Sequence, residues 1–327
     1  MNQRLLITGA SGFVGYHLIE SALNRNLEVF VAVRKSSDVK HLQSYALHYT
    51  YPDFSNVASL EQELREKKYD FVIHAAGTTK ARSAEEYNYV NGTYTGNLAK
   101  AITQCGDQVK KLVFMSSLGS IGPLLHPNDL LTETTTPTPV TAYGKSKLLA
   151  ERLLEAYDLP LVTLRPTAVY GPREKDIFIV LKTISQGLEP YIGRVPQQLS
   201  FVYVKDLAEV TMNALFSQAS GAFNITDGNC YGRYELANIV KKILGKKTIR
   251  FHVPYDIVKG LAILLEKGYG LVNKTSVLNN EKLNELTAIN WCCDIGKAKA
   301  ELNYQPRYNL EKGLEEALEW YRTNKWL

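Results

Sequence analysis

Cysteine is scarce in this sequence, and its spacing argues against a metal centre. The chain has 4 cysteines and 6 histidines in 327 residues, with no C-x-x-C pair and no close pair of histidines. A structural zinc site normally needs such pairs, so we expect no bound metal. With no export signal in view, we expect a cytoplasmic protein with reduced thiols.

Long hydrophobic runs are also missing. The first apolar run, LLI, meets a glycine at once, which is unlike a secretory leader. The most apolar helical stretch, IVKGLAILLEKGYGLV, is interrupted by Lys259, Glu266 and Lys267 and is too short to span a bilayer. This stretch could touch a membrane surface, form the wall of an apolar substrate pocket, or simply pack in the core.

Charge of one sign is not in strong excess. There are 38 basic and 33 acidic residues, a net charge of +5, and no run of five or more like charges. This balance gives no reason to expect a nucleic-acid partner. Hydrophobic residues make up 45% and charged residues 22%, which is typical of a soluble globular protein. The expected partner is therefore a small-molecule substrate.

The first half of the chain alternates short apolar runs with longer amphipathic stretches. This rhythm predicts a parallel sheet flanked by helices. The candidate strands are RLLIT, LEVFVAV, ALHYTY, YDFVIHA, VKKLVFMS and LPLVTLR. Six such strands predict an α/β fold with a Rossmann-type doubly wound sheet, and we assign residues 1–166 to this dinucleotide-binding domain.

After residue 166 the alternation of apolar runs and amphipathic stretches becomes irregular. The stretches TAVYGPREKD, GLEPYIGRVPQQ and FNITDGNCYGR read as loops, which favours a smaller α/β substrate domain. The strand FVYV and the helix KDLAEVTMNALF could return to the main sheet, so we expect interleaved domains. We assign residues 201–222 to the first domain, and 167–200 with 223–327 to the second.

A glycine-rich turn, TGASGFVG, follows the first predicted strand and precedes a predicted helix. Small residues there let the backbone approach a pyrophosphate, whose charge faces the free amides and positive end of the helix. The spacing departs from G-x-G-x-x-G and could mark only a tight turn, but its position favours a dinucleotide site. The predicted cofactor contacts in this turn are Gly9, Ser11, Gly12, Phe13, Val14 and Gly15.

The end of the second predicted strand carries Arg34 and Lys35. A carboxylate at this point would suit the ribose of NAD, whereas a guanidinium suits the 2′-phosphate of NADP(H) by charge and bidentate geometry. We therefore favour NADP(H). Asp38 lies a few residues on and keeps NAD(H) possible, and a basic pair on a surface loop can also be merely solvated.

A tyrosine four residues before a lysine occurs four times, but only one pair has a suitable context. Tyr143 and Lys147 lie in TAYGKSKLLAERLLEAY, whose periodicity predicts a helix with both side chains on one face. Ser117 ends the preceding strand, at the edge where such sheets present residues to a ligand. The pairs that begin at Tyr255, Tyr308 and Tyr321 lack such a partner, and we interpret them as structural.

The sequence resembles the extended branch of the short-chain dehydrogenase/reductase superfamily, the NAD(P)-dependent epimerases, dehydratases and reductases. The resemblance covers nearly the whole chain: TGASGFVG, VIHAAG, VNGTYTGNL, FMSS, YGKSK, LRPTAVYGPR and FVYVKDLA. It implies an NAD(P)-dependent enzyme, a homodimer, and a catalytic trio of Ser117, Tyr143 and Lys147. It also implies further cofactor-lining residues: Asp53, Phe54, Ala75, Ala76, Gly77, Asn91, Pro166 and Val169, with Tyr143 and Lys147 contributing as well.

Physical chemistry agrees with this trio. A free tyrosine has a pKa of ~10, so proton transfer near neutral pH requires a positive charge that stabilises its phenolate. Lys147 would supply that charge and hold the nicotinamide ribose, Ser117 would hold the substrate oxygen, and Tyr143 would transfer the proton.

Residues beyond the trio separate the reactions of this branch. Dehydratases carry an acidic pair after the catalytic hydroxyl, where this chain has S-L-G-S, so we expect no dehydration. Sugar-nucleotide epimerases carry an arginine where this chain has Leu199 and Ser200, and a diphosphate without a cation is costly. We therefore favour the dihydroflavonol-reductase and 3β-hydroxysteroid-dehydrogenase side, with a partly apolar, non-nucleotide substrate.

Two alternatives stay open at this point. Arg173 or Arg194 could replace the missing cation, which keeps an epimerase as the second candidate. A cofactor-binding protein without turnover is less favoured, because such relatives usually lose the tyrosine or the lysine. The stretch LLHPNDLLTETTTPTPVT is polar and proline-bearing, and we expect it to form a loop over the active site.

Overall fold

The centre of the protein is a parallel β-sheet with helices on both faces. The computed structural model describes residues 2–271 and 280–327, the side chains of 265–271 and 280 excepted. In this part of the chain the main sheet is 7-stranded, in the order β11-β6-β5-β4-β1-β2-β3. Its strands are β1 (Arg4–Thr8), β2 (Glu28–Ala32), β3 (His48–Thr50), β4 (Phe71–His74), β5 (Lys111–Met115), β6 (Leu161–Pro166) and β11 (Gly221–Ile225).

The strand order changes direction between β1 and β4, and this position defines the ligand crevice of such a sheet. Each strand alternates its side chains between two layers of helices. Leu5 and Ile7 of β1 belong to the hydrophobic cluster on one face, and Leu6 belongs to the cluster on the other. The predicted Rossmann-type sheet is confirmed, including all six predicted strands.

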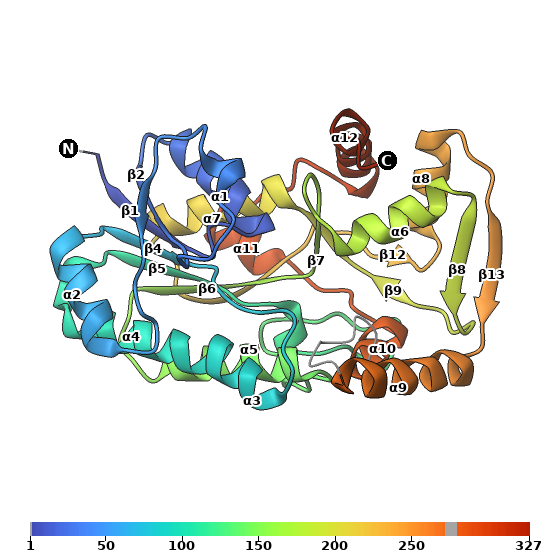
Figure 1. Cartoon of the computed structure of the whole chain (residues 1–327), viewed down its shortest axis with the longest axis horizontal. Coiled ribbons are helices and arrows are strands. Elements are labelled where there is room, and N and C mark those ends of the chain that lie inside the picture. Colours follow the sequence, from blue (N-terminus) through green and yellow to red (C-terminus); the bar gives the residue numbers. More distant parts are fainter. Residues whose placement is uncertain (1, 272–279) are drawn as a thin grey trace.

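Figure 1 shows the two helical layers above and below the sheet. One layer contains α1 (Phe13–Leu23), α7 (Val204–Phe216) and α11 (Gly296–Glu301). The other contains α2 (Val57–Lys67), α4 (Tyr94–Gln104) and α5 (Ala142–Glu155). The short α3 (Ala84–Tyr87) and a π-helical turn (Asn88–Thr93) precede α4, and short 3₁₀ turns cover Lys40–Leu42, Gly106–Gln108 and Leu118–Ser120.

The remaining elements form a smaller lobe at one end of the sheet (Figure 1). Its helices are α6 (Asp176–Ser185), α8 (Glu235–Leu244), α9 (Tyr255–Leu271), α10 (Asn280–Thr287) and α12 (Leu310–Thr323). Its strands are β7 (Ala168–Tyr170), β8 (Leu188–Ile192), β9 (Gln198–Leu199), β10 (Phe201–Tyr203), β12 (Tyr231–Gly232) and β13 (Ile249–Val253). They form three pairs, β10-β7, β12-β9 and β13-β8.

Three stretches that we predicted as loops contain strands. TAVYGPREKD includes β7, GLEPYIGRVPQQ includes β8, and FNITDGNCYGR includes part of β11 and β12. The prediction failed for β11 because this strand lies at the sheet edge and contains Gly221 and Asn224, residue types that are depleted in strands and common in turns. The division of the chain into two domains stays a prediction.

The predicted return of FVYV to the main sheet is wrong. Its strand β10 pairs in parallel with β7 and not with any strand of the main sheet. The helix that follows it, α7, does pack against the main sheet, because Val210 and Ala214 lie in the same hydrophobic cluster as Leu18 of α1. The chain therefore returns to the main sheet through a helix and not through a strand.

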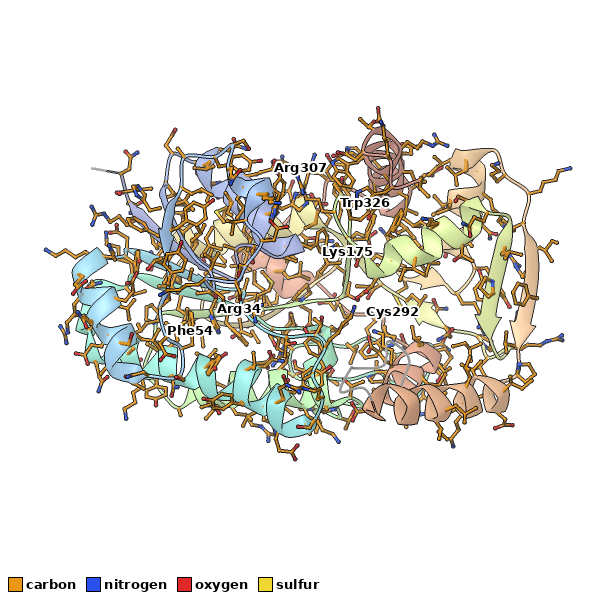
Figure 2. The ribbon with its side chains drawn as sticks, viewed as in Figure 1. Arg34, Phe54, Lys175, Cys292, Arg307 and Trp326 are labelled. Carbon is orange, nitrogen blue, oxygen red and sulfur yellow. A yellow bond between two sulfur atoms is a disulfide. The ribbon has the colours of Figure 1, made fainter. Side chains whose placement is uncertain are left out.

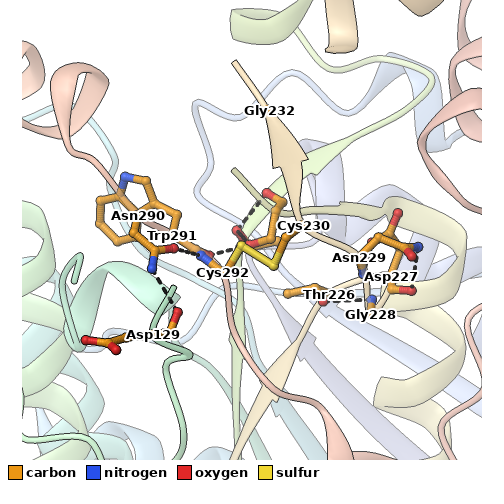
Figure 3. The surroundings of a disulfide bond; sticks show 12 residues. Asp129, Thr226, Asp227, Gly228, Asn229, Cys230, Gly232, Asn290, Trp291 and Cys292 are labelled. Atoms are coloured by element: carbon orange, nitrogen blue, oxygen red, sulfur yellow. Dashed lines mark hydrogen bonds between the residues drawn. A yellow bond between two sulfur atoms is a disulfide. The ribbon is translucent and has the colours of Figure 1, made fainter. Parts of the chain in front are cut away.

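The predicted reduced state of all four thiols is also wrong. Cys230 and Cys292 form a disulfide, with Cα atoms 5.4 Å apart and a sequence separation of 62 (Figure 3). Nearby, the Asn290 side-chain amide donates to the carbonyl oxygens of His126 and Asp129, as part of Figure 3 shows. A pairing between residues so distant in sequence depends on how β12 and the segment before α11 meet, which local patterns do not encode.

The apolar stretch IVKGLAILLEKGYGLV forms α9, as predicted, but its described side chains are mostly not in the core. Val258 and Ala262 are buried, whereas Ile257, Leu261 and Leu264 are exposed. Val272 and the side chains of residues 265–271 lie outside the part of the chain that the structure describes. Among the described residues, none of the helices is long and apolar enough to cross a membrane.

Candidate active site

The glycine turn after β1 packs directly against the end of β4. Gly9 has φ +70°, and a Cβ atom there would lie 2.5 Å from the carbonyl oxygen of Ala75. A Cβ atom on Gly15 would lie 2.3 Å from the carbonyl oxygen of Gly9. Only glycine allows the turn to close in this way.

The first turn of α1 leaves its amides free for a ligand. Gly12 is the exposed N-cap of this helix, and a glycine has no side chain that could cap the free amides. The first turn also contains no acidic residue. Free amides and the positive end of a helix dipole together favour an anion. Ser11, Phe13 and Val14 surround this helix end, so the turn fits the pyrophosphate of a dinucleotide.

His74 links the end of β4 to the helices below the sheet. The Ala76 amide donates to Thr8 Oγ1 (3.0 Å), and the Thr95 hydroxyl donates to the Asn91 carbonyl (2.6 Å). Thr8 Oγ1 is 2.8 Å from His74 Nδ1 and Thr95 Oγ1 is 2.9 Å from Nε2, so these bonds fix a neutral imidazole that carries its proton on Nε2. Burial agrees, since it lowers the pKa of His74 to about 3.

Asn91 holds the segment after β4 in place. Its side chain is buried, accepts from the Thr78 amide (2.7 Å) and donates to the Thr78 carbonyl (3.0 Å) and to Ser146 Oγ (2.9 Å). It lies in the π-helical turn, whose wider backbone turns the amide toward this segment. The predicted residue Asn91 therefore joins Gly77 and its neighbours to α5.

Lys147 lies at the centre of the predicted site. Its Nζ donates to the Met115 carbonyl (2.8 Å) and lies 3.3 Å from the position that a Cβ on Gly77 would occupy. Because the side chain is only 5% exposed, burial lowers the pKa of Lys147 to about 8, and the nearby carboxylate of Glu151 opposes this shift. An ammonium is thus held between the ends of β4 and β5.

Tyr143 and Ser117 interact with each other near the start of the helix that carries Lys147. Burial raises the pKa of Tyr143 to about 12, while a hydrogen bond with the Ser117 side chain lowers it and the negative charge of Glu285 raises it further. Ser117 caps the 3₁₀ turn after β5, and its Oγ accepts from the Gly119 amide (3.1 Å). The Tyr87 ring packs edge-on against Tyr143, with 6.3 Å between centroids. Tyr143 and Ser117 are therefore brought together, and Lys147 lies one helical turn after Tyr143 on α5. The catalytic role of the three residues stays a prediction.

The predicted contacts for the adenosine end of the cofactor lie around the ends of β2 and β3. Arg34 and Lys35 are exposed, and Arg34 forms a turn closed by Ser37. Figure 2 labels Arg34 and Phe54 among the side chains. Asp53 is also exposed, and hydrogen bonds from Ser55 lower its pKa. The ring of Phe54 lies 5.9 Å from that of His74, so this side chain faces the end of β4.

The remaining predicted contacts lie across the crevice. Pro166 is buried at the end of β6, and Val169 is half-buried in β7. Val169, Ala75 and Val14 pack against the same hydrophobic cluster.

A model of the NAD dependent epimerase/dehydratase family matches residues 5–226. The chain belongs to this family. Among known relatives, a UDP-glucose 4-epimerase of Vibrio cholerae is 27% identical over 97% of this chain and 94% of its own length. A decarboxylating sterol-4-alpha-carboxylate 3-dehydrogenase of Saccharomyces cerevisiae is 26% identical, with 97% of each chain covered.

A solved UDP-glucose 4-epimerase of Thermotoga maritima, bound to UDP-glucose, matches this fold with a TM-score of 0.80 and 23% identity. The match covers 99% of this chain and 100% of that one, and at this identity it shows the fold alone. The predicted membership of the extended short-chain dehydrogenase/reductase superfamily is confirmed. The protein is an NAD(P)-dependent enzyme of the epimerase/dehydratase family.

Two buried residues behind the site of this family enzyme were missed from the sequence. Glu151 is 3% exposed and lies one helical turn after Lys147. Its carboxylate accepts from Arg165 Nη2 (2.6 Å) and Nε (3.1 Å), from Ser120 Oγ (2.7 Å) and from Ser116 Oγ. Two features of the sequence could have indicated this pair: a glutamate four residues after Lys147, and an arginine near the end of the next strand.

Proposed function

We propose that this family enzyme is an NADP(H)-dependent oxidoreductase that interconverts a carbonyl and an alcohol on a partly apolar, non-nucleotide substrate. The observation that carries the proposal is the position of the Lys147 ammonium. It lies 3.3 Å from where a Cβ on Gly77 would be, so it faces the segment where the nicotinamide ribose would bind. Tyr143, one turn earlier on the same helix, interacts with Ser117. The cofactor would supply or accept a hydride.

The chain's own side chains would handle the proton. Ser117 Oγ holds the substrate oxygen, and Tyr143 gives it a proton in reduction or removes one in oxidation. Because burial raises the pKa of Tyr143 to about 12, the phenolate needs a cation, and Lys147 provides one at pH values below its own pKa of about 8. Asn91 keeps Thr78 and Gly77 at the distance this arrangement requires.

The surroundings of Ser200 support a substrate without a diphosphate. Ser200 is 2% exposed, donates to the Trp291 carbonyl (2.7 Å) and shares a hydrogen bond with Thr167. Arg173, one candidate for the missing cation, stacks its guanidinium 4.0 Å above the Tyr16 ring. An arginine held there is not free to pair with a phosphate in the crevice.

A sugar-nucleotide 4-epimerase is the second candidate. The Vibrio cholerae relative, described as a UDP-glucose 4-epimerase, favours it, and Arg194 is exposed near the end of β8. The Saccharomyces cerevisiae relative, described as a sterol dehydrogenase, favours the reductase.

The exposed Arg34 supports NADP(H) over NAD(H). We also propose that the enzyme is a cytoplasmic homodimer, on the strength of its family alone.

Turnover assays with the cofactor absorbance as readout test the proposed reaction. A reductase consumes one cofactor for each product, whereas an epimerase oxidises and re-reduces its substrate and gives no net change. We expect aldehydes, ketones or hydroxysteroids to give a stoichiometric signal, and we expect none from UDP- or dTDP-sugars. Turnover of a sugar nucleotide without net cofactor consumption would establish the epimerase instead.

The Tyr143→Phe variant tests the assigned proton donor. We expect kcat to fall by about 10²–10⁴-fold, because the variant loses only the transferable proton. The dissociation constant of the cofactor, measured by fluorescence quenching, should stay within about twofold, since the ring and its packing are kept. Near-normal turnover by this variant would disprove the mechanism.

A further inference from the structure

The two-stranded sheet β8–β13 has two unlike faces. On one face, Glu189 is 2% exposed and accepts from Lys241 Nζ (2.9 Å) and Arg250 Nε (2.7 Å). Arg250 Nη2 also donates to Asn238 Oδ1 (3.1 Å). Lys241 and Asn238 belong to α8, so this helix covers the polar face of the sheet.

The opposite face of the same sheet is apolar, and it is exposed except at Ile192 and Val253, which are half-buried. Because side chains alternate along a strand, the residues between the polar ones share the other face. The pairs in register there are Leu188 with Ile249, Pro190 with Phe251, and Ile192 with Val253. Ile249 is 69% exposed, Leu188 42% and Phe251 40%. None of the six belongs to a hydrophobic cluster of the described residues.

Helix α9, which follows β13 in the chain, carries further exposed apolar residues. It begins two residues after β13, at the outer end of the small lobe (Figure 1). Ile257, Leu261 and Leu264 are spaced at i, i+4 and i+7, which puts them on one side of the helix, and they are 62%, 50% and 69% exposed. We call the six strand residues and these three helix residues the apolar edge.

Exposed cations flank the apolar edge. Lys246 and Lys247 directly precede β13, Arg194 follows β8, and Lys259 lies on α9. Asp256 is the exposed carboxylate within the same segments, 186–195 and 245–264. Apolar side chains with a rim of basic residues are the combination that binds the interface of an anionic bilayer.

We propose that the apolar edge binds the surface of a lipid bilayer that contains anionic lipids. An apolar surface of this kind on a soluble-type fold marks a binding site. A second copy of the chain is the other candidate occupant, but a two-fold contact would place the same cations opposite one another. Anionic headgroups instead neutralise them. The bilayer contact is peripheral, and it is independent of the reaction proposed above.

Vesicle co-sedimentation of the full chain tests this proposal. We expect binding to vesicles of phosphatidylcholine with phosphatidylglycerol, weaker binding to phosphatidylcholine alone, and release at high salt. The double variant Phe251→Ser, Ile257→Ser should lower the binding constant by about tenfold or more, because it removes two large apolar contacts.

Two further variants sharpen the test. Ile179→Ser is the matched control, since Ile179 is 56% exposed but lies on α6, outside the apolar edge, and its binding should stay within about twofold of the parent chain. The double variant Lys246→Glu, Lys247→Glu should weaken binding to the anionic vesicles and reduce its salt dependence.

Three outcomes would overturn the proposal. The first is that the parent chain binds neither vesicle type, and the second is that the Phe251→Ser, Ile257→Ser variant binds as well as the parent. The third is a parent dimer that becomes a monomer in this variant by light scattering, which would assign the apolar edge to a second copy. No outcome depends on turnover, so failure here leaves the proposed reaction untouched.

Discussion

Glu151 is the buried carboxylate whose charge acts most directly on the predicted site. It is paired with Arg165 and raises the pKa of Lys147, while burial lowers that pKa to about 8. A neutral side chain at position 151 would therefore let the pKa of Lys147 fall further. It would also leave the Arg165 guanidinium buried without its partner.

The Glu151→Gln variant should move the alkaline limb of the kcat/KM profile to lower pH by about one unit, because Lys147 then loses its proton earlier. It should also reduce the free energy of unfolding by about 3 kcal/mol, the cost of an uncompensated buried charge. Denaturant unfolding and pH–rate profiles measure the two effects. Glu155→Gln, an exposed change one turn later on α5, is the control and should alter neither.

Lys147 itself makes stability depend on pH. Its pKa in the folded enzyme, about 8, is below the value of ~10.4 for an unfolded chain. Between these two values the unfolded state binds more protons at this residue, so the burial of Lys147 destabilises the enzyme at neutral pH. That destabilisation is relieved as the pH rises through the window.

Arg34 is the residue on which the proposed cofactor preference depends. If its guanidinium pairs with the 2′-phosphate of NADP(H), Arg34→Ala should weaken NADPH binding by about tenfold and leave NADH within about twofold. Isothermal titration with both cofactors gives the two constants. Arg65→Ala removes the same charge from α2, where Arg65 pairs with Glu61, and should change neither. Tighter binding of NADH than NADPH by the parent chain would reverse the assignment.

At the scale of the element, α5 carries the site because of how it begins. Thr141 is its N-cap and accepts from the Gly144 amide (3.0 Å). Gly144 lies against the 3₁₀ turn that starts at Ser117: a Cβ atom there would be 2.3 Å from the Gly119 carbonyl oxygen. The helix that presents Tyr143 and Lys147 is thus in backbone contact with the turn that presents Ser117.

The Gly144→Ala variant should separate these two elements. Alanine favours a helix over glycine by about 1 kcal/mol, but the contact with the Gly119 backbone cannot relax without moving α5. We expect a net loss of about 1–3 kcal/mol in unfolding free energy, together with a lower kcat. Thermal unfolding and turnover check both. Gly96→Ala on α4 is the matched control: its Cβ would meet Leu153 at 3.4 Å, so it should be neutral or slightly stabilising.

At the scale of the whole molecule, the small lobe contacts the start of the helix that carries Tyr143. Glu281 of α10 accepts from the Ala142 amide at the start of α5 (2.8 Å), and the charge of Glu285 reaches Tyr143. The predicted loop LLHPNDLLTETTTPTPVT contains no helix, and Leu124 and Leu131 within it pair with Asn290 and Cys293. Its predicted role over the active site stays a prediction, but it does join the two lobes.

The sequence alone determined the main sheet, the glycine turn and the helix that carries Tyr143 and Lys147. Each depends on local chemistry: apolar runs of strand length, glycines at a strand–helix junction, and a four-residue spacing on a helix. It also identified the family, because those local motifs occur together in one order. Resemblance rather than periodicity supplied Asn91, whose hydrogen bonds to Thr78 and Ser146 appear only when the chain is folded.

Only the tertiary structure decided which distant segments meet. The edge position of β11, the pairing of β10 with β7, the Cys230–Cys292 disulfide and the buried pair of Glu151 and Arg165 all join residues that no short window contains. The apolar edge is the same kind of feature. The sequence predicted a loop where β8 lies, and the exposure of its apolar residues follows from α8 covering one face of the β8–β13 sheet and leaving the other open.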